Sequence, residues 1–301
     1  MSETVLAADR RYLWALCYRM TGCAADADDV TQEVFRRALE SPPARPGPWR
    51  PWLVRVAVNL CRDLLRRRRR EAAGTWLPGP IEDDDPALSA VEPVPTEHRY
   101  ELLESVSFAF LLALEALTPA QRAVLLLRDV FDRSVHEVAT CLGRSETNVK
   151  VIHHRARRVL ERYDRERLPA RPEAGAEAGR LLAQLLAALT AGDGAAAEQL
   201  LSADARLLSD SGREFHAARV PVVGRDRIAA FLQKLAHRRG LPDRVELRPL
   251  NGVPSVVATY DGPVPTGEAP RFVMLPELGP DGRLRAIYTV LQTRKLTAVR
   301  A

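Results

Sequence analysis

Basic and amide side chains gather in one stretch of the chain in a pattern that suits nucleic acid. Between residues 134 and 160 a short turn containing Gly143 joins two segments of helical spacing, and the second carries most of the cations. Such a helix can enter the major groove, where its first residues meet base edges and its later cations meet phosphates. The stretch predicts a DNA-binding helix-turn-helix, although a solvated basic face on a plain bundle would share this composition. The candidate contacts are Ser145, Glu146, Thr147, Asn148, Lys150, His153, His154, Arg155, Arg157 and Arg158.

A second group of side chains follows a proline-rich bend at residues 41–48. Tryptophans, arginines and an asparagine recur along a segment that ends in the arginine run 66–70. Aromatic rings stack on unpaired bases while arginines hold the backbone of a single strand. The group therefore favours a single-strand contact, with Trp52 equally suited to a core. Its candidates are Trp49, Trp52, Arg55, Asn59, Arg62 and Arg66.

A polar face marks the helix expected at residues 26–39. It lies opposite the apolar stripe formed by Val30, Val34 and Ala38. Acidic residues in a first turn complement the helix dipole, so this face is either a partner site or a simple consequence of that dipole. The candidate partner contacts are Asp28, Asp29, Gln32, Glu33 and Arg36.

Metal binding and catalysis find little support among the remaining reactive side chains. The four cysteines (Cys17, Cys23, Cys61 and Cys141) form no Cys-x-x-Cys pair and lie at no metal-ligand spacing from a histidine. We therefore expect buried thiols with no metal and no cofactor, a Cys17–Cys23 redox pair being the alternative. A set of Asp210, His216 and Asp226 could transfer protons, but too few paired polar groups accompany it, and we expect no enzyme.

The elements that position these groups fall into several domains. A chain of 301 residues exceeds one ordinary core, and no apolar run approaches the roughly 20 residues of a membrane span. We expect a soluble, cytoplasmic protein with no membrane partner. Residues 1–72 hold 14 Lys/Arg against 9 Asp/Glu, whereas residues 73–117 hold 1 against 9. The Pro- and Asp-rich part of this acidic piece, 74–95, predicts a linker with little core of its own.

Helical spacing dominates up to residue 160, and strand patterns follow it. Capping boxes are expected at Thr118-Pro119 and at Ser134 with Glu137, and Ser145 should cap the last helix of this part. Strands are predicted at 205–208, 246–250, 256–260, 271–275 and 284–289, with helices at 181–190 and 225–237. The fold class is therefore multidomain, with two all-α domains, the second a helix-turn-helix, before an α+β domain.

The sequence resembles extracytoplasmic-function (ECF) sigma factors over residues 1–165. The resemblance rests on Tyr18-Arg-Met-Thr-Gly22, Asp26-Ala-Asp-Asp-Val-Thr-Gln-Glu33, Trp52-Leu-Val-Arg-Val-Ala-Val-Asn59 and Leu117-Thr-Pro-Ala-Gln-Arg122. It implies sigma region 2 at 1–72, which binds core polymerase and the −10 element with a base-capture loop at 41–50. An acidic linker at 73–104 and region 4 at 105–168, which binds the −35 element, would follow. The face of Asp28 to Arg36 becomes the polymerase contact.

The remaining residues resemble the SnoaL-like domain of one ECF subgroup, placed here at 176–301. The matching segments are Leu207–Glu214, Pro221–Ile228 and Asn251–Pro254, with Trp76-Leu-Pro-Gly-Pro80 in the linker. The subgroup has Glu where this chain has Gly79, and it has Asp-Gly-Gly-Gly-Lys and Asn-Pro-Asp-Lys-Leu where this chain has 210–214 and 292–296. The resemblance implies a cone-shaped regulatory domain that contacts the linker through Trp76, Leu77, Pro78, Asp210, Arg213, Lys295 and Leu296.

The partners implied are promoter DNA and core RNA polymerase, bound through its β′ clamp helices and β flap. Whether the C-terminal cavity binds a small ligand is left open by the sequence. The free protein is expected to be monomeric. Promoter elements about 17 base pairs apart lie about 58 Å from each other, within reach of a 30-residue extended linker. Two alternatives remain. One is a ligand-responsive helix-turn-helix regulator that binds DNA without polymerase, and the other is a cavity enzyme whose turnover survives loss of residues 1–168.

Overall fold

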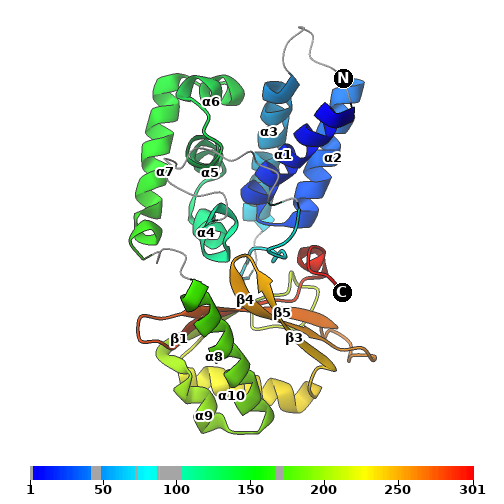
Figure 1. Ribbon diagram of the computed structural model, residues 1–301, viewed down its shortest axis with the longest axis vertical. Coiled ribbons are helices and arrows are strands. Elements are labelled where there is room, and N and C mark those ends of the chain that lie inside the picture. Colours follow the sequence, from blue (N-terminus) through cyan, green and yellow to red (C-terminus); the bar gives the residue numbers. More distant parts are fainter. Residues whose placement is uncertain (1–2, 42–48, 72–73, 87, 89–103, 167–171) are drawn as a thin grey trace. The chain divides into compact units, whose positions relative to one another are not determined.

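The computed structural model describes residues 3–41, 49–71, 74–86, 88, 104–166 and 172–301 (Figure 1). The chain divides into two compact units. Unit 1 contains residues 1–72 and 84–167, and unit 2 contains residues 73–83 and 168–301. Each unit has its own buried core, as expected for a chain of this length.

The first half of unit 1 is a three-helix arrangement. Helices α1 (Glu3–Thr21), α2 (Ala24–Glu40) and α3 (Trp49–Glu71) bury apolar stripes against one another, including Leu13, Val34 and Ala57. Gly22 joins α1 to α2 at φ 68°, a left-handed conformation that favours glycine. The long α3 thereby receives a fixed support on one side, while its other side carries arginines.

The second half of unit 1 is a set of short helices followed by a long one. They are η1 (Glu104–Val106), α4 (Phe108–Ala113), η2 (Leu114–Ala116), α5 (Pro119–Leu125), η3 (Leu126–Val130), α6 (Val135–Leu142) and α7 (Glu146–Glu166). The capping boxes expected at Thr118 and Ser134 are both present. The π-helical turn η3 was not expected, because its spacing is indistinguishable from that of a continuing α-helix.

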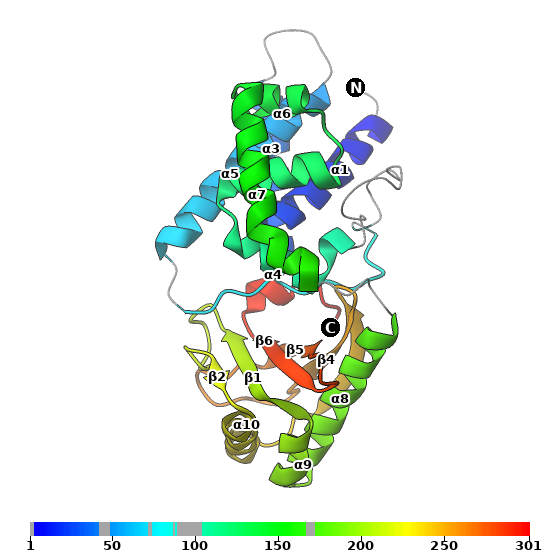
Figure 2. The ribbon, with the colours of Figure 1, turned by 90° about the vertical axis from the view of Figure 1, so that its left-hand side faces the viewer.

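Unit 2 is a twisted sheet with helices against one face (Figure 2). The strands are β1 (Leu201–Asp210), β2 (Val222–Val223), β3 (Arg244–Leu250), β4 (Val253–Thr259), β5 (Arg271–Leu278) and β6 (Leu284–Val290), in the order β2-β1-β6-β5-β4-β3. Strands β1 and β6 are parallel and the other neighbours antiparallel. Helices α8 (Pro172–Thr190), α9 (Gly194–Gln199) and α10 (Arg225–Arg239) share their core with the sheet. The α+β fold is confirmed.

The segment at residues 74–83, expected to have little core of its own, packs with unit 2. Leu77 and Ile81 are completely buried within unit 2, and Glu82 forms an antiparallel bridge with Leu250 of β3. The short helix η4 (Thr293–Leu296) lies beside this segment, since Lys295 bonds to Leu77. The segment is thus held by residues far along the chain, which its own composition does not reveal.

Two further expectations concern cysteines and membranes. Cys17, Cys23 and Cys61 are buried free thiols, and Cys141 is partly exposed. The thiol of Cys61 pairs with Cys17, a hydrogen bond that together with burial raises the Cys61 pKa. Over the described ranges, no helix is long and apolar enough to cross a membrane.

Candidate nucleic-acid, polymerase and linker contacts

The helix-turn-helix is built by local capping. Ser134 accepts a hydrogen bond from the Glu137 amide while the Glu137 side chain accepts one from the Ser134 amide, which fixes the start of α6. Gly143 ends α6 at φ 61°, and the Arg144 amide donates to the carbonyl of Ala139. The Ser145 hydroxyl accepts from the Asn148 amide and starts α7. The turn between the helices is therefore fixed by its own residues.

The DNA-facing candidates divide along α7 by exposure. Ser145, Thr147, Asn148 and Lys150 at its start are exposed, as is Glu146, whose carboxylate contacts His136 at 3.0 Å. Val149, Ala156 and Leu160 are buried on the inner face, so the helix is amphipathic. Further along, three of the five remaining candidates are exposed, namely His154, Arg155 and Arg158.

The other two candidates on α7 have a structural partner. His153 Nε2 lies 2.8 Å from Asp129 Oδ1, and the Arg157 guanidinium donates to both carboxylate oxygens at 2.7 and 3.1 Å. Burial alone would raise the pKa of Asp129, but these hydrogen bonds outweigh it and hold that pKa below its ordinary value. His153 and Arg157 thus anchor α7 to η3, a role that the sequence pattern did not distinguish from phosphate contact.

The candidates for single-strand contact all lie on α3. Trp49 and Trp52 meet edge to face with ring centroids 6.3 Å apart, and both are half-buried. Arg55, Asn59 and Arg66 are exposed. The preceding base-capture loop lies outside the described residues, apart from its ends.

Arg62, also on α3, is buried instead. Its side chain bonds to Asn59 at 3.2 Å, while its Nε has no hydrogen-bond partner. Burial lowers the Arg62 pKa, as do the nearby charges of Arg66 and Arg144. Because Arg144 belongs to the helix-turn-helix, the two predicted DNA-contact surfaces lie close enough for their charges to interact.

Buried arginines join the two halves of unit 1. Arg122 of α5 donates to the carbonyl of Met20 at 3.0 Å and also to Leu114 and Glu115. Arg68 of α3 reaches the Glu115 carboxylate at 3.0 and 3.1 Å. A single carboxylate therefore holds two largely buried guanidinium groups, one from each half.

The polar face of α2 is open to solvent for most of its length. Asp28 accepts a hydrogen bond from the Trp14 indole at 2.7 Å, and Asp29 and Gln32 are exposed. Glu33 pairs with Arg36 and Arg37, and hydrogen bonds from these two arginines lower its pKa to about 2.

One residue on this face escaped the sequence interpretation. Leu39 of α2 is 87% exposed. The only signal in the sequence was an apolar side chain outside the Val30, Val34 and Ala38 stripe. Single exposed apolar residues are common on protein surfaces, so Leu39 by itself does not mark a contact surface.

The linker-facing candidates meet around a buried ion pair in unit 2. The Asp210 carboxylate accepts the Leu77 amide at 2.7 Å and pairs with Lys295. Lys295 also donates to the Leu77 carbonyl at 2.6 Å, and its ammonium lies 3.9 Å from the centroid of the Trp76 ring. Pro78 and Leu296, which follow Leu77 and Lys295 in the sequence, are also buried. Arg213 is instead exposed, in the turn after β1 and with φ 65°.

Sequence reasoning missed a second set of contacts on the same segment. The Ile81 amide donates to the Asn251 side chain at 2.9 Å, and the Asn251 amide donates to the Ile81 carbonyl at 3.1 Å. Glu82, which is buried, pairs with Arg248 at 3.2 Å and with Arg300. Asn251 lay within a segment quoted for the resemblance, but its partner could not be found without the fold.

The three residues considered as an acid-base set, Asp210, His216 and Asp226, have different surroundings and do not form one site. Asp210 is occupied by Lys295, Asp226 is exposed in the first turn of α10, and His216 is exposed at a cavity of unit 2. The described residues contain no group of three or more metal-ligating side chains.

Comparison with known proteins agrees with this arrangement. Residues 6–71 match the family model of Sigma-70 region 2, and residues 107–160 match that of Sigma-70, region 4. The chain is 39% identical over 217 residues to the ECF RNA polymerase sigma factor SigG of Mycobacterium tuberculosis strain CDC 1551 / Oshkosh, which covers 65% of this chain and 58% of the relative.

A second relative covers nearly the whole chain. The ECF RNA polymerase sigma factor SigJ of M. tuberculosis strain ATCC 25618 / H37Rv is 30% identical over 309 residues, covering 99% of this chain and 94% of the relative. The crystal structure of M. tuberculosis SigJ superposes with a TM-score of 0.70 at 28% identity and covers 99% of both chains. This chain belongs to the ECF sigma factors, initiation factors that direct core RNA polymerase to promoters, and it carries a C-terminal SnoaL-like domain.

Proposed function

We propose that the sigma activity of this chain is divided among three helices. The start of α7 recognises the −35 element, α3 with its preceding loop recognises the −10 element, and the polar face of α2 binds the β′ clamp helices. The observation that carries this proposal is the exposed start of α7, where four candidate base contacts follow a rigidly capped turn. Region 4 as a whole is assigned to the β flap, and the factor acts in the cytoplasm with no enzymatic activity of its own.

The functional boundaries follow the same proposal. Region 2 spans 1–72, region 4 spans 105–168 and the regulatory domain spans 176–301, with the linker at 73–104 between the two readers of DNA. The part of this linker at 73–83 packs with unit 2, so the regulatory domain holds one end of the connection.

Regulation through this connection is the second part of the proposal. Backbone groups of Leu77 and Ile81 are each bonded twice to unit 2, and both side chains are completely buried. Such a docked segment cannot extend, so fewer residues remain to span the roughly 58 Å between promoter elements. The SnoaL-like domain thereby sets the reach of region 4 relative to region 2.

Run-off transcription tests the sigma activity. Core polymerase and this chain are incubated with the DNA upstream of its own gene, and a discrete transcript is expected only when both are present. Tight binding to the duplex by the protein alone, without any transcript, would favour a ligand-responsive regulator. The variant Lys150→Ala should reduce the transcript, while Arg227→Ala, at an exposed arginine of unit 2, should not.

A further inference from the structure

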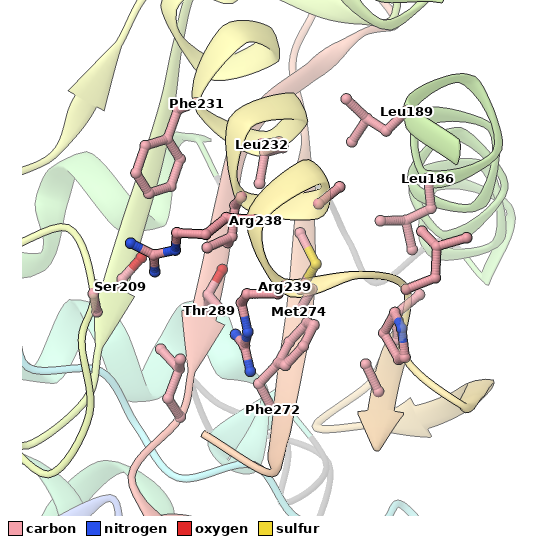
Figure 3. A pocket seen from close by; sticks show the side chains of 18 of the residues that line it. Leu186, Leu189, Ser209, Phe231, Leu232, Arg238, Arg239, Phe272, Met274 and Thr289 are labelled. Carbon is pink, nitrogen blue, oxygen red and sulfur yellow. The ribbon is translucent and has the colours of Figure 1, made fainter. Parts of the chain in front are cut away.

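A cavity of about 520 Å³ lies between the helices and the sheet of unit 2 (Figure 3). This volume is in the range of sites that enclose small molecules. Its walls are largely apolar and come from α8, α10 and the strands, including Leu186, Leu189, Phe231, Val256 and Met274. An apolar ligand body would therefore be desolvated here.

Several cationic side chains belong to the lining of this cavity. Lys234, Arg238 and Arg239 of α10 belong to the lining, as does His216, and among the lining residues that the structure describes none is acidic. Glu268, which is buried and outside the lining, pairs with both arginines and lies 3.9 Å from His216. One carboxylate therefore pairs with two guanidinium groups, which leaves an excess of positive charge.

The orientation of the arginines is not explained by the helix alone. Basic residues in a last turn complement the helix dipole even when they point to solvent. Arg239 instead is only 4% exposed, donates to the Ala269 carbonyl at 2.6 Å, and lies 4.7 and 5.8 Å from the centroids of the Tyr260 and Phe272 rings. Both guanidinium groups turn from α10 toward the strands in Figure 3.

Two hydroxyl groups add hydrogen-bond donors to the lining of the cavity. Ser209 of β1 and Thr289 of β6 are paired neighbours in the sheet and both line the cavity. Hydroxyls and guanidinium groups together are donors suited to the planar oxygens of a carboxylate. The rest of the lining is mostly apolar, so a second charged group elsewhere on the ligand would find no hydrogen-bond partner.

We propose that this cavity binds an apolar monocarboxylate, with its acid group held by Arg238 and Arg239 beside Ser209 and Thr289 and its apolar body among the leucines and Phe231. The proposal deepens the regulatory role given above to unit 2 and rests on it. The residue after Ser209 is Asp210, which holds the linker, so a ligand would bind on the strand that also carries the linker contact.

Calorimetric titration of the full chain, without polymerase, tests the proposal with decanoate, decan-1-ol and decyltrimethylammonium as probes. Decanoate is expected to bind at least tenfold more tightly than decan-1-ol, and the cation is expected not to bind. Arg238→Gln, whose side chain is 59% exposed and thus tolerant of change, should weaken decanoate at least fivefold and leave decan-1-ol unaltered. Arg227→Gln, an exposed arginine of the same helix outside the lining, should alter neither.

A filled cavity provides the second variant. Leu186→Trp places a larger side chain in the lining and should abolish binding of decanoate and decan-1-ol alike. The proposal is overturned if decan-1-ol binds as tightly as decanoate, if Arg238→Gln binds decanoate normally, or if no probe binds. Run-off transcription with the same preparations distinguishes failure of the ligand proposal from failure of the proposed sigma activity. A chain that initiates transcription but binds no probe would overturn only the ligand proposal.

Discussion

At the scale of single residues, the buried pair of Lys295 and Asp210 illustrates how strongly one side chain can act. Both side chains are under 5% exposed, and both also bond to the backbone of Leu77. Removing one partner of a buried pair leaves an uncompensated charge, which costs more than removing both. The pair therefore ties linker docking to the stability of unit 2.

Lys295→Met should lower the free energy of unfolding of unit 2 by about 3–5 kcal/mol, because Asp210 loses its counter-charge. Urea unfolding followed by hydrogen exchange of peptides from β1 and β6 measures this. The double variant Lys295→Met with Asp210→Leu should recover much of the loss, and Lys234→Met, a lysine exposed on α10, should stay within about 0.5 kcal/mol of the parent. An equal loss in the double variant would contradict the argument.

Gly79 stands where the subgroup that the chain resembles has glutamate, and the close packing around Gly79 gives a physical reason for the difference. A Cβ at this position would lie 3.0 Å from the Lys295 carbonyl oxygen and 3.3 Å from the Lys295 Cβ. A side chain such as the subgroup's glutamate therefore requires the linker or η4 to move, as in an overpacked core.

Gly79→Glu should weaken docking of the linker by about 1–3 kcal/mol for this reason. The readout is hydrogen exchange of the Leu77 and Ile81 amides, which should become faster while exchange in β5 stays unchanged. Gly262→Ala is the matched control, because nothing lies within 4 Å of its added Cβ and its φ is not positive. Unchanged protection in Gly79→Glu would show that η4 accommodates the side chain.

At the scale of elements, α7 combines an exposed side, proposed to face DNA, with an anchoring side. Lys150 is exposed at its start, whereas Arg157 and His153 hold the buried carboxylate of Asp129. Substitutions on the two sides should thus have different consequences.

Lys150→Ala should weaken −35 binding by about 1–3 kcal/mol, as expected for a base contact, without changing thermal stability. Arg157→Ala should lower the stability of unit 1 as well, because Asp129 loses two of its hydrogen bonds. Footprinting of promoter DNA together with thermal unfolding separates the two effects. Normal −35 protection in Lys150→Ala would argue against α7 as the recognition helix.

The same carboxylate predicts a pH dependence. The pKa of Asp129 is lower in the folded chain than its ordinary value of 3.8, so its ion pairs stabilise unit 1 above that pH. The stabilisation is lost as pH falls from about 4 through the folded pKa. Asp129→Asn should therefore be less stable than the parent at pH 7 by thermal unfolding, and the difference should shrink as the pH is lowered below about 4. A difference independent of pH would exclude this ion pair as its cause.

Elements fixed by near neighbours were predictable from the sequence, and those fixed by distant ones were not. The caps at Ser134, Gly143 and Ser145 act within a few residues, so their residue types alone indicate the helix-turn-helix. The burial of Ile81 depends on Asn251, 170 positions away, and was missed. Arg62 was expected to face DNA, but it is buried. Helical periodicity shows which residues share a face of α3 and does not show which distant residues pack against that face.

At the scale of the whole molecule, the packing within unit 1 bears on how the factor meets a promoter. Glu115 of region 4 holds Arg68 of region 2 and Arg122 of α5, and Arg62 is buried next to Arg144 of the helix-turn-helix. Promoter elements about 17 base pairs apart lie about 58 Å from each other, whereas α3 and α7, the helices proposed to read them, belong here to one compact unit. We infer that the two halves separate when both elements are bound.

Glu115→Ala should favour that separation, since two largely buried guanidinium groups lose their shared carboxylate. The apparent affinity of a partner is reduced by the fraction of molecules that can bind it, so a less stable closed form should raise affinity for core polymerase by about tenfold. Competition between the variant and the parent for core polymerase measures this, and Glu177→Ala, which breaks an exposed pair with Arg180 in unit 2, serves as the control. If hydrogen exchange shows the halves loosened while polymerase affinity is unaltered, separation is not the step that limits binding, and the closed packing acts only on the free protein.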